Sequence, residues 1–166
     1  MSLTDKIYSS YSKLAPNIDV NSEQNFQYFD QELKKINNLD KKKIIEIGYG
    51  KGFFLEWAKN KKLDIIGYEI NEEFHKIAKL NHKVILGDGR NISREISVKF
   101  DLIILFDVVE HIDKEKLLSF FENLYELLNE KGEVLLRFPN GSSAAGLEYF
   151  NSDLTHFSFK KDGKKS

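Results

Sequence analysis

A glycine-rich segment directly after the first strongly apolar run is the part of the sequence best suited to hold a ligand. It contains Gly48, Gly50 and Gly52 and leads straight into a helical pattern. Glycines tolerate positive φ angles and let the backbone come close to a ligand, and the amides at a helix start are free to donate hydrogen bonds. The segment therefore predicts a cradle for a polar group, with a tight strand-to-helix turn as the purely structural alternative.

Acidic residues follow the next two apolar runs. Glu69 ends the second run, 21 residues after Gly48, where its carboxylate can accept both hydroxyls of a ribose lying over the glycine turn. The alternative role for Glu69 is to favour the start of the following helix through the helix dipole. Asp88 lies between two glycines after the third run, where it can accept a hydrogen bond from an exocyclic amine. A bound nucleoside would account for all three features.

The spacing of the glycines distinguishes between two kinds of nucleoside cofactor. The third glycine falls four residues after the first, in the pattern GxGxG. The dinucleotide fingerprint is GxGxxG, whose last glycine packs against the strand so that the helix start meets a pyrophosphate. The pattern therefore disfavours an NAD-dependent dehydrogenase, which remains an alternative enzyme class.

Short apolar runs alternate with amphipathic helical patterns from Lys43 onward, which is typical of βαβ units. The runs are IIEIG, DIIGYE, VILGD, FDLIILFD and EVLLRFP. They predict an α/β fold, a doubly wound and mainly parallel sheet with helices on both faces. Ligands of such sheets bind beyond the carboxyl ends of the strands, where the glycine turn and both acids fall. The helix before the last run is expected to bury a stripe formed by Leu117, Phe121, Leu124 and Leu128.

The length of 166 residues fits a single domain. We divide it into a helical N-terminal segment at residues 1–40, a cofactor-binding core at 41–140 and a partial acceptor-side segment at 141–166. The N-terminal segment is expected to pack beside the core and to cover the acceptor side. Its apolar face, spaced three and four residues apart, consists of Phe26, Phe29, Leu33 and Ile36. No oligomeric state follows from the sequence.

The composition disfavours several classes of protein. Basic and acidic residues nearly cancel, 25 against 26, and only Arg90, Arg94 and Arg137 are arginines, which disfavours a nucleic-acid partner. The absence of cysteine excludes disulfides and thiolate metal sites. No segment has the pattern of a signal peptide or reaches the roughly 18 apolar residues of a membrane span. A cytoplasmic protein without a membrane partner is therefore expected.

The motifs EIGYGKG, YE, GD, FDLIILFDVVEH and LLNEKGEVLLRFPN together resemble the class I S-adenosylmethionine-dependent methyltransferases over residues 43–140. The resemblance is strongest to their methyltransferase-type-23 and ubiquinone-pathway branch. It implies that the glycine loop holds the methionine end of S-adenosylmethionine, that Glu69 binds the ribose and that Asp88 binds the adenine. The positions that it assigns to the cofactor are Glu46, Gly48, Tyr49, Gly50, Glu69, Ile70, Asp88, Gly89, Phe106 and Asp107. The resemblance also implies a three-layer, Rossmann-like sheet in the order 3-2-1-4-5. The family sheet has two further strands after the fifth, and these are expected to be missing here.

Methyl transfer to a hydroxyl group needs a base, and two histidines are candidates. His111 comes directly after the fourth run, and His156 lies in the segment after the fifth. The resemblance extends to an acidic-x-x-Glu-His pattern that binds a divalent ion such as Mg²⁺ in some relatives. The residues that it assigns to this ion are Asp107, Glu110, His111 and His156. The alternative is that Glu110 only favours the start of the next helix.

These features predict an S-adenosylmethionine-dependent methyltransferase that methylates an oxygen of a small molecule or of a sugar or polysaccharide precursor. Candidates for contact with an acceptor ring are Tyr8, Tyr11, Tyr149, Phe150 and Phe157. A cofactor-binding module without catalysis is the alternative, because an incomplete acceptor pocket would leave cofactor binding intact. An RNA methyltransferase is disfavoured by the near-zero net charge and the few arginines.

Overall fold

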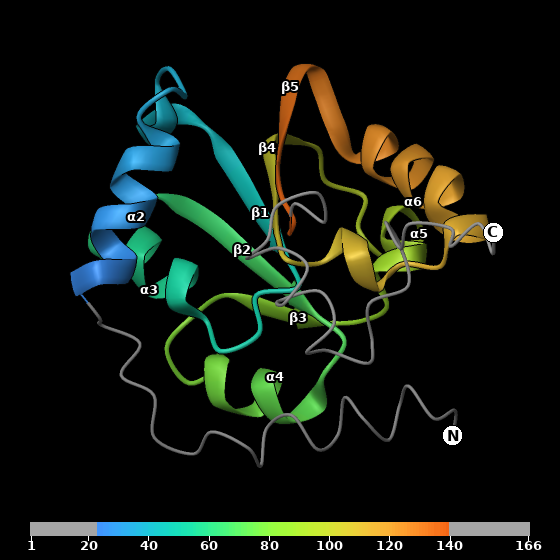
Figure 1. Ribbon diagram of the computed structural model, residues 1–166, viewed down its shortest axis with the longest axis horizontal. Coiled ribbons are helices and arrows are strands. Elements are labelled where there is room, and N and C mark those ends of the chain that lie inside the picture. The colour runs from blue at the N-terminus through green and yellow to red at the C-terminus, as the bar shows by residue number, and fades with distance from the viewer. Residues whose placement is uncertain (1–22, 140–166) are drawn as a thin grey trace, which may run out of the picture.

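A five-stranded parallel sheet forms the centre of the computed structural model, which describes residues 23–139 (Figure 1). Its order is β3-β2-β1-β4-β5, and every neighbouring pair is parallel. The strands are β1 (Lys43–Ile47), β2 (Asp64–Glu69), β3 (Val84–Leu86), β4 (Phe100–Phe106) and β5 (Leu128–Arg137). The predicted Rossmann-like fold and strand order are confirmed. Predictions for residues 1–22 and 140–166, including those for His156 and the five acceptor aromatics, lie outside the described residues.

Helices cover both faces of this sheet and complete three layers (Figure 1). The longer helices are α2 (Glu23–Leu33), α3 (Phe53–Asn60), α4 (Glu72–Ala78), α5 (Ile92–Glu95) and α6 (Lys114–Leu127). The 3-10 turns are η1 (Leu39–Lys41), η2 (Gly89–Asn91) and η3 (Val109–His111). Helices α2, α3 and α4 pack on one face, and α5 and α6 pack on the other. No helix within residues 23–139 combines the length and the apolar character needed to cross a membrane.

The central strands are apolar along almost their whole length because both of their faces are buried. Successive side chains point to opposite faces of the sheet, so alternate residues of each strand belong to the cores on its two sides. Ile45 and Ile103 pack with the α5 and α6 side, whereas Ile44 and Leu102 pack with the α2 and α3 side. Each of these four side chains is fully buried.

Helix α2 is held on the sheet by an aromatic cluster. The centroid of the Phe29 ring lies 5.1 Å from that of Phe54 in α3 and 5.6 Å from that of Phe106 at the end of β4. Phe29 and Leu33 are buried, and Phe26 and Ile36 pack against the same cluster. The predicted apolar face of the N-terminal segment is therefore confirmed, and it brings α2 to the carboxyl end of β4.

The boundary between α6 and β5 differs from the prediction. The helix ends at Leu127, and the residues that it buries most deeply are Phe120, Leu124 and Leu127. Leu128, expected in the helix, begins β5, and Leu117 and Phe121 are only partly buried. The pairing with β4 then jumps, because Phe100 pairs with Leu128 but Leu102 pairs with Glu133. Between these two pairs β5 has three residues more than β4, a bulge-like shift of register that the hydrophobic periodicity of the helix does not reveal.

A glycine in β2 allows α3 and the glycine turn to pack closely on the sheet. A β-carbon at Gly67 would lie 2.6 Å from Cδ1 of Tyr49 and 2.9 Å from Cδ1 of Leu55. We expect Gly67→Ala to lower the free energy of unfolding by about 1–3 kcal/mol, the usual cost of overpacking a core. Urea denaturation measures this difference.

Gly89→Ala is the matched control, since the nearest contact of a β-carbon there is 3.4 Å, to Cγ2 of Ile47. Unchanged stability of Gly67→Ala would show that Tyr49 and Leu55 move aside without loss.

Candidate functional site

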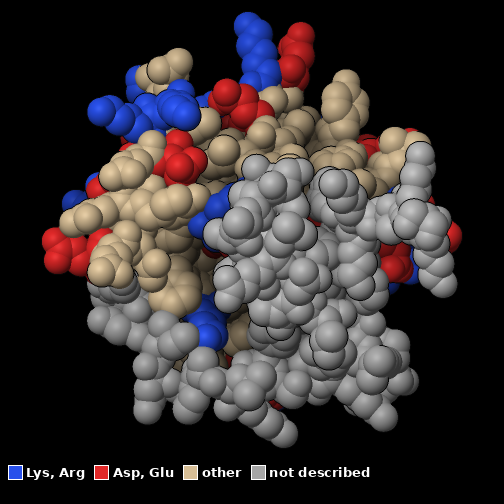
Figure 2. Space-filling view, viewed as in Figure 1, with Lys and Arg blue, Asp and Glu red and all other residues tan. Residues whose placement is uncertain are grey.

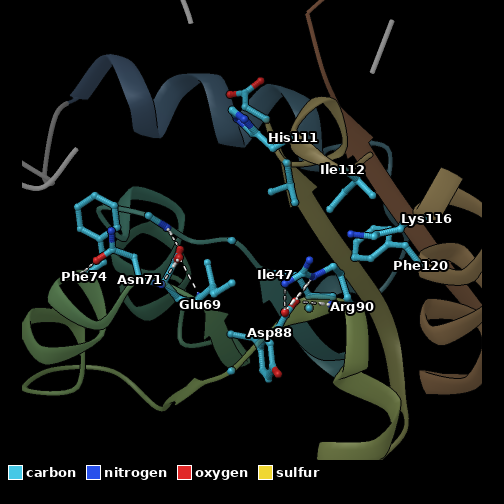
Figure 3. Close-up of a pocket in the computed structure, with 18 of the residues that line it drawn as sticks. Ile47, Glu69, Asn71, Phe74, Asp88, Arg90, His111, Ile112, Lys116 and Phe120 are labelled. Carbon is cyan, nitrogen blue, oxygen red and sulfur yellow. Dashed lines mark hydrogen bonds and ion pairs between the residues drawn. The ribbon is translucent and has the colours of Figure 1, made fainter. Parts of the chain in front are cut away.

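A cleft of about 470 Å³ opens at the carboxyl ends of the strands (Figure 3). Its walls come from the glycine turn after β1, the ends of β2 and β3, the loop after β4 and the first half of α6. In Figure 3, Glu69 and Asn71 lie on one side and Lys116 on the other. Asp88 and His111 lie at opposite ends of this view. The cleft is where a doubly wound sheet binds its ligands.

The glycine turn has a backbone that side chains would not allow. Gly48, Gly50 and Gly52 have φ angles of 74°, 51° and 81°, in the left-handed region. A β-carbon at Gly48 would also lie 2.5 Å from Cγ2 of Val108, in the loop after β4. Gly48 and Gly50 line the cleft, so the first expectation from the sequence holds: the backbone itself forms this wall.

Glu69 joins the glycine turn to the start of α4. Its Oε2 accepts a hydrogen bond from the amide of Gly50 at 2.9 Å, and its Oε1 accepts from the amides of Ile70 and Asn71 at 2.9 and 2.8 Å. Burial raises the pKa of Glu69, while these three backbone donors act in the opposite direction. The carboxylate lines the cleft although only 6% of the residue is exposed. The side chain of Glu69 therefore lies both at the start of α4 and at the wall of the cleft.

Asp88 lines the cleft beside Gly89, as expected, but its carboxylate is engaged by a neighbour. The guanidinium of Arg90 pairs with both carboxylate oxygens, and the Arg90 amide donates to Oδ1 at 3.0 Å. Burial acts to raise the pKa of Asp88, but the bonds from Arg90 outweigh it and the pKa is lowered. Asp88 is therefore an ionised acceptor whose partner a ligand amine has to share or replace.

The loop after β4 forms the opposite wall. Asp107, Val108 and His111 line the cleft, and the Asp107 carboxylate pairs with Arg137 at the end of β5. The structure thus places one of the two candidate bases, His111, at the cleft. The side chain of Lys116, from the first turn of α6, lies on the same side.

The described residues do not form the predicted metal site. Glu110 is fully buried and does not line the cleft, whereas Asp107 and His111 do. Within residues 23–139, no group of three or more histidine, aspartate or glutamate side chains comes close enough to hold an ion. Glu110 lies in the short 3-10 turn after β4 and is enclosed there, which an acidic-x-x-Glu-His spacing does not show. The described residues therefore do not support the metal hypothesis, and its fourth ligand, His156, lies outside them.

Three residues assigned to the cofactor by resemblance lie behind the cleft wall rather than on it. Tyr49 is buried against Leu55 and Ala78. Phe106 packs with Phe29 in the α2 cluster. Glu46 is 3% exposed, in the interior of β1. The remaining assigned positions line the cleft: Gly48, Gly50, Glu69, Ile70, Asp88, Gly89 and Asp107.

The sequence reasoning missed several residues of the site. Arg90 follows Gly89 directly, and its charge next to an acid was the available signal. Val108 and Lys116 carry no local signal, because their contacts depend on how the loop after β4 and α6 fold back over the glycine turn. Arg137 was visible only as one of three arginines, at the end of an apolar run.

Comparisons of the sequence with known proteins bear on the family. The sequence profile described as "Methyltransferase domain" matches residues 21–162. An uncharacterized methyltransferase of Alkaliphilus oremlandii (strain OhILAs) is 26% identical over 140 residues, which cover 81% of this chain and 64% of that protein. The chain thus spans slightly less than two thirds of the length of this relative.

Solved structures share the fold. A SAM-dependent methyltransferase from Archaeoglobus fulgidus superposes with a TM-score of 0.71 at 23% identity, covering 90% of this chain and 66% of that one. An S-adenosylmethionine-dependent methyltransferase from Clostridium acetobutylicum ATCC 824 gives a TM-score of 0.57 at 22% identity, covering 80% and 56%. These similarities show a common Rossmann-like architecture.

The buried Glu46 makes stability depend on pH. Burial raises the pKa of its carboxyl group from 4.5 to about 8, the Glu69 charge adds to the rise, and Arg137 opposes it. Between these values the native protein keeps a proton that the unfolded chain releases, so stability falls as pH rises through this window. We expect Glu46→Gln, which cannot ionise, to gain stability over the wild type as pH rises, by up to about 1 kcal/mol per pH unit.

Urea denaturation across the range from about pH 5 to pH 8 measures this difference. Glu126→Gln, on the exposed side of α6, is the matched control. A constant difference between Glu46→Gln and the wild type would mean that Glu46 is ionised in the native protein throughout.

Proposed function

Because the chain belongs to the methyltransferase-domain family, we propose that it binds S-adenosylmethionine in the cleft and transfers the methyl group to an oxygen of a small molecule. The observation that carries this proposal is that the glycine turn, Glu69 and Asp88 line one cleft. They come from the ends of three different strands, and each suits one part of a nucleoside linked to an amino acid. A tight turn alone would not require the two acids to face the same space.

The groups in the cleft fit this cofactor. Gly48 and Gly50 line the cleft at the turn, where the methionine end would lie. A carboxylate oxygen can accept two hydrogen bonds, and Oε2 of Glu69 accepts one from the amide of Gly50, which leaves capacity for a ribose hydroxyl. The carboxylate of Asp88 can accept a hydrogen bond from the adenine amine when it keeps only part of its contact with Arg90. The volume of about 470 Å³ lies in the usual range of small-molecule sites.

Glu46, Tyr49 and Phe106 support this site from behind in the proposal. Tyr49 fills the space between the glycine turn and Gly67 of β2, so it fixes the height of the turn above the sheet. Burial raises the pKa of Glu46 to about 8, so Glu46 keeps its proton at neutral pH and places no second charge beside Glu69. No step of the proposed reaction involves a metal ion.

The chemistry left to the protein is alignment and proton removal. The bound cofactor would supply a methyl group already activated by its sulfonium. The chain then has to hold an acceptor oxygen in line with that carbon and take up its proton. His111 lines the cleft and is our candidate for this base among the described residues. His156 stays a second candidate from the sequence.

A small hydroxylated acceptor, such as a sugar precursor, suits the surface better than RNA. On the face shown in Figure 2, basic and acidic side chains lie next to one another along the upper edge of the described surface. The cleft itself mixes both signs, with Arg90 and Lys116 beside Asp88 and Asp113. A phosphate backbone binds along continuous positive charge, which this mixture does not provide.

The first test concerns the cofactor. We expect S-adenosylhomocysteine to bind and NAD not to bind, and Glu69→Ala to weaken S-adenosylhomocysteine binding by about 1.5–3 kcal/mol, because hydrogen bonds to a charged group are lost. An analogue without the ribose hydroxyls should bind wild type and Glu69→Ala with nearly equal affinity. Titration calorimetry measures all of these affinities.

Glu72→Gln, at the exposed start of α4, is the control for charge near the cleft. If Glu69→Ala weakens both ligands equally, Glu69 acts by holding the glycine turn and not by binding the ribose. Binding of NAD in preference to S-adenosylhomocysteine would favour the dehydrogenase.

The second test concerns the acceptor and the base. Radiolabelled S-adenosylmethionine would be supplied with nucleotide sugars, quinol precursors, small amines and short RNAs at several salt concentrations. We expect labelled oxygen in a small acceptor, and a kcat lower by about 10²- to 10⁴-fold in His111→Gln, the usual contribution of a general base. Binding of S-adenosylhomocysteine should stay unchanged in this variant.

His82→Gln is the control. His82 lies in the turn before β3, its side chain pairs with Glu56 of α3, and it does not line the cleft. Salt-sensitive labelling of RNA alone would overturn the small-acceptor proposal. Cofactor binding without any transfer would favour a binding module, and wild-type kcat in His111→Gln would exclude His111 as the base.

A further inference from the structure

The loop after β4 begins with a residue in an unfavourable backbone conformation. Asp107 has a φ angle of 57°, in the left-handed region that non-glycine residues rarely adopt. It directly follows β4, and after Val108 the chain enters the 3-10 turn Val109–His111. The left-handed residue therefore sets the direction in which the whole loop leaves the sheet. Some interaction has to hold it there.

Arg137 makes three contacts with Asp107. Its carbonyl oxygen accepts the amide of Asp107 at 2.9 Å, which extends the β4–β5 ladder by one bond. Its Nε donates to Oδ1 of Asp107 at 3.2 Å, and its Nη2 donates to Oδ2. Two parallel bonds from one guanidinium fix both the position and the rotation of the carboxylate.

The guanidinium is itself held by aromatic rings. Its central carbon lies 4.7 Å from the ring centroid of Phe106 and 5.1 Å from that of Tyr28 in α2. The Phe106 ring in turn stacks on Phe29 of α2, at 5.6 Å and an interplanar angle of 19°. A planar cation between such rings has little freedom to rotate. Helix α2 is therefore linked to the loop after β4 through Arg137.

The consequence of this arrangement reaches the glycine turn. Val108 follows Asp107 and its Cγ2 occupies the space beside Gly48, where a β-carbon would lie only 2.5 Å away. A different backbone conformation at Asp107 would move Val108 away from this contact. It would also move His111, which lies on the same short loop and lines the cleft.

We propose that Arg137 is a positioning residue that holds Asp107 in the left-handed conformation and thereby seats Val108 against the glycine turn. For ligand binding, the inference rests on the proposed function, since it takes the cleft as the cofactor site. Lysine cannot replace Arg137 in this role, because an ammonium group is a point charge without the planar fork. Nothing in this inference requires Arg137 to touch the cofactor.

A double-mutant cycle tests the proposal through ligand affinity. We expect Arg137→Lys to weaken S-adenosylhomocysteine binding by about tenfold, because a non-glycine residue no longer held in this region leaves it. In the Asp107→Gly background, where the conformation needs no support, Arg137→Lys should change the affinity by less than about twofold. Arg94→Lys, on the exposed side of α5, is the matched control.

Equal losses in the two backgrounds would overturn the proposal, because Arg137 would then act independently of Asp107. Complete loss of binding in Asp107→Gly alone would also overturn it, since the carboxylate would then act on the ligand directly. Unchanged affinity in Arg137→Lys would also overturn the proposal. The emission of the single tryptophan, the buried Trp57 in the α2 cluster, confirms that each variant is folded.

Nuclear magnetic resonance tests the same proposal without a ligand. In the wild type, the Val108 methyl protons should show a nuclear Overhauser effect to the α-protons of Gly48, because these groups are in contact. Arg137→Lys should weaken this signal, and adding Asp107→Gly should restore it. An undiminished signal in Arg137→Lys would overturn the positioning role even if S-adenosylhomocysteine did not bind, so this failure is distinct from failure of the proposed function.

Discussion

The geometry of the cleft depends on the hydrogen bonds that the carboxylate of Glu69 accepts. The carboxylate accepts a hydrogen bond from the amide of Gly50 on one side and from the amides of Ile70 and Asn71 on the other. A single buried carboxylate therefore joins the loops after β1 and β2. A carboxylate in this position would be unfavourable without its donors, because burial alone raises its pKa. The donors keep the carboxylate oriented, as the proposed ribose acceptor has to be before its ligand arrives.

The glycine turn is held from its other side by the loop after β4. Val108 packs against Gly48, and that loop is fixed to β5 by Asp107 and Arg137. The turn thus lies between a polar support from β2 and an apolar support from β4. Both supports come from strands directly beside β1 in the sheet, which is why a parallel order of 2-1-4 is enough to build the site.

Much of this architecture follows from local sequence. The apolar runs and the helical patterns between them predict the parallel sheet, because strands buried on both faces are continuously apolar. The strand order follows from the family resemblance. Residue type and spacing predict which residues lie together at the carboxyl ends of the strands, because these ends meet at one edge of such a sheet. The residues are Gly48, Gly50, Glu69 and Asp88. Helix α2 was found because its apolar residues repeat at three and four positions. In each case a short-range pattern carries the information.

The sequence by itself therefore determined the fold class, the edge of the sheet at which the cleft opens and the acids that line it. Tertiary structure alone decided which neighbours complete the site. The burial of Glu110, the bulge after Leu128 and the pairing of Asp107 with Arg137 depend on segments that meet only after the sheet forms. The acidic-x-x-Glu-His spacing that suggests a metal site does not specify which way a side chain points within a 3-10 turn. Side-chain direction is set there by long-range packing, and no local pattern encodes it.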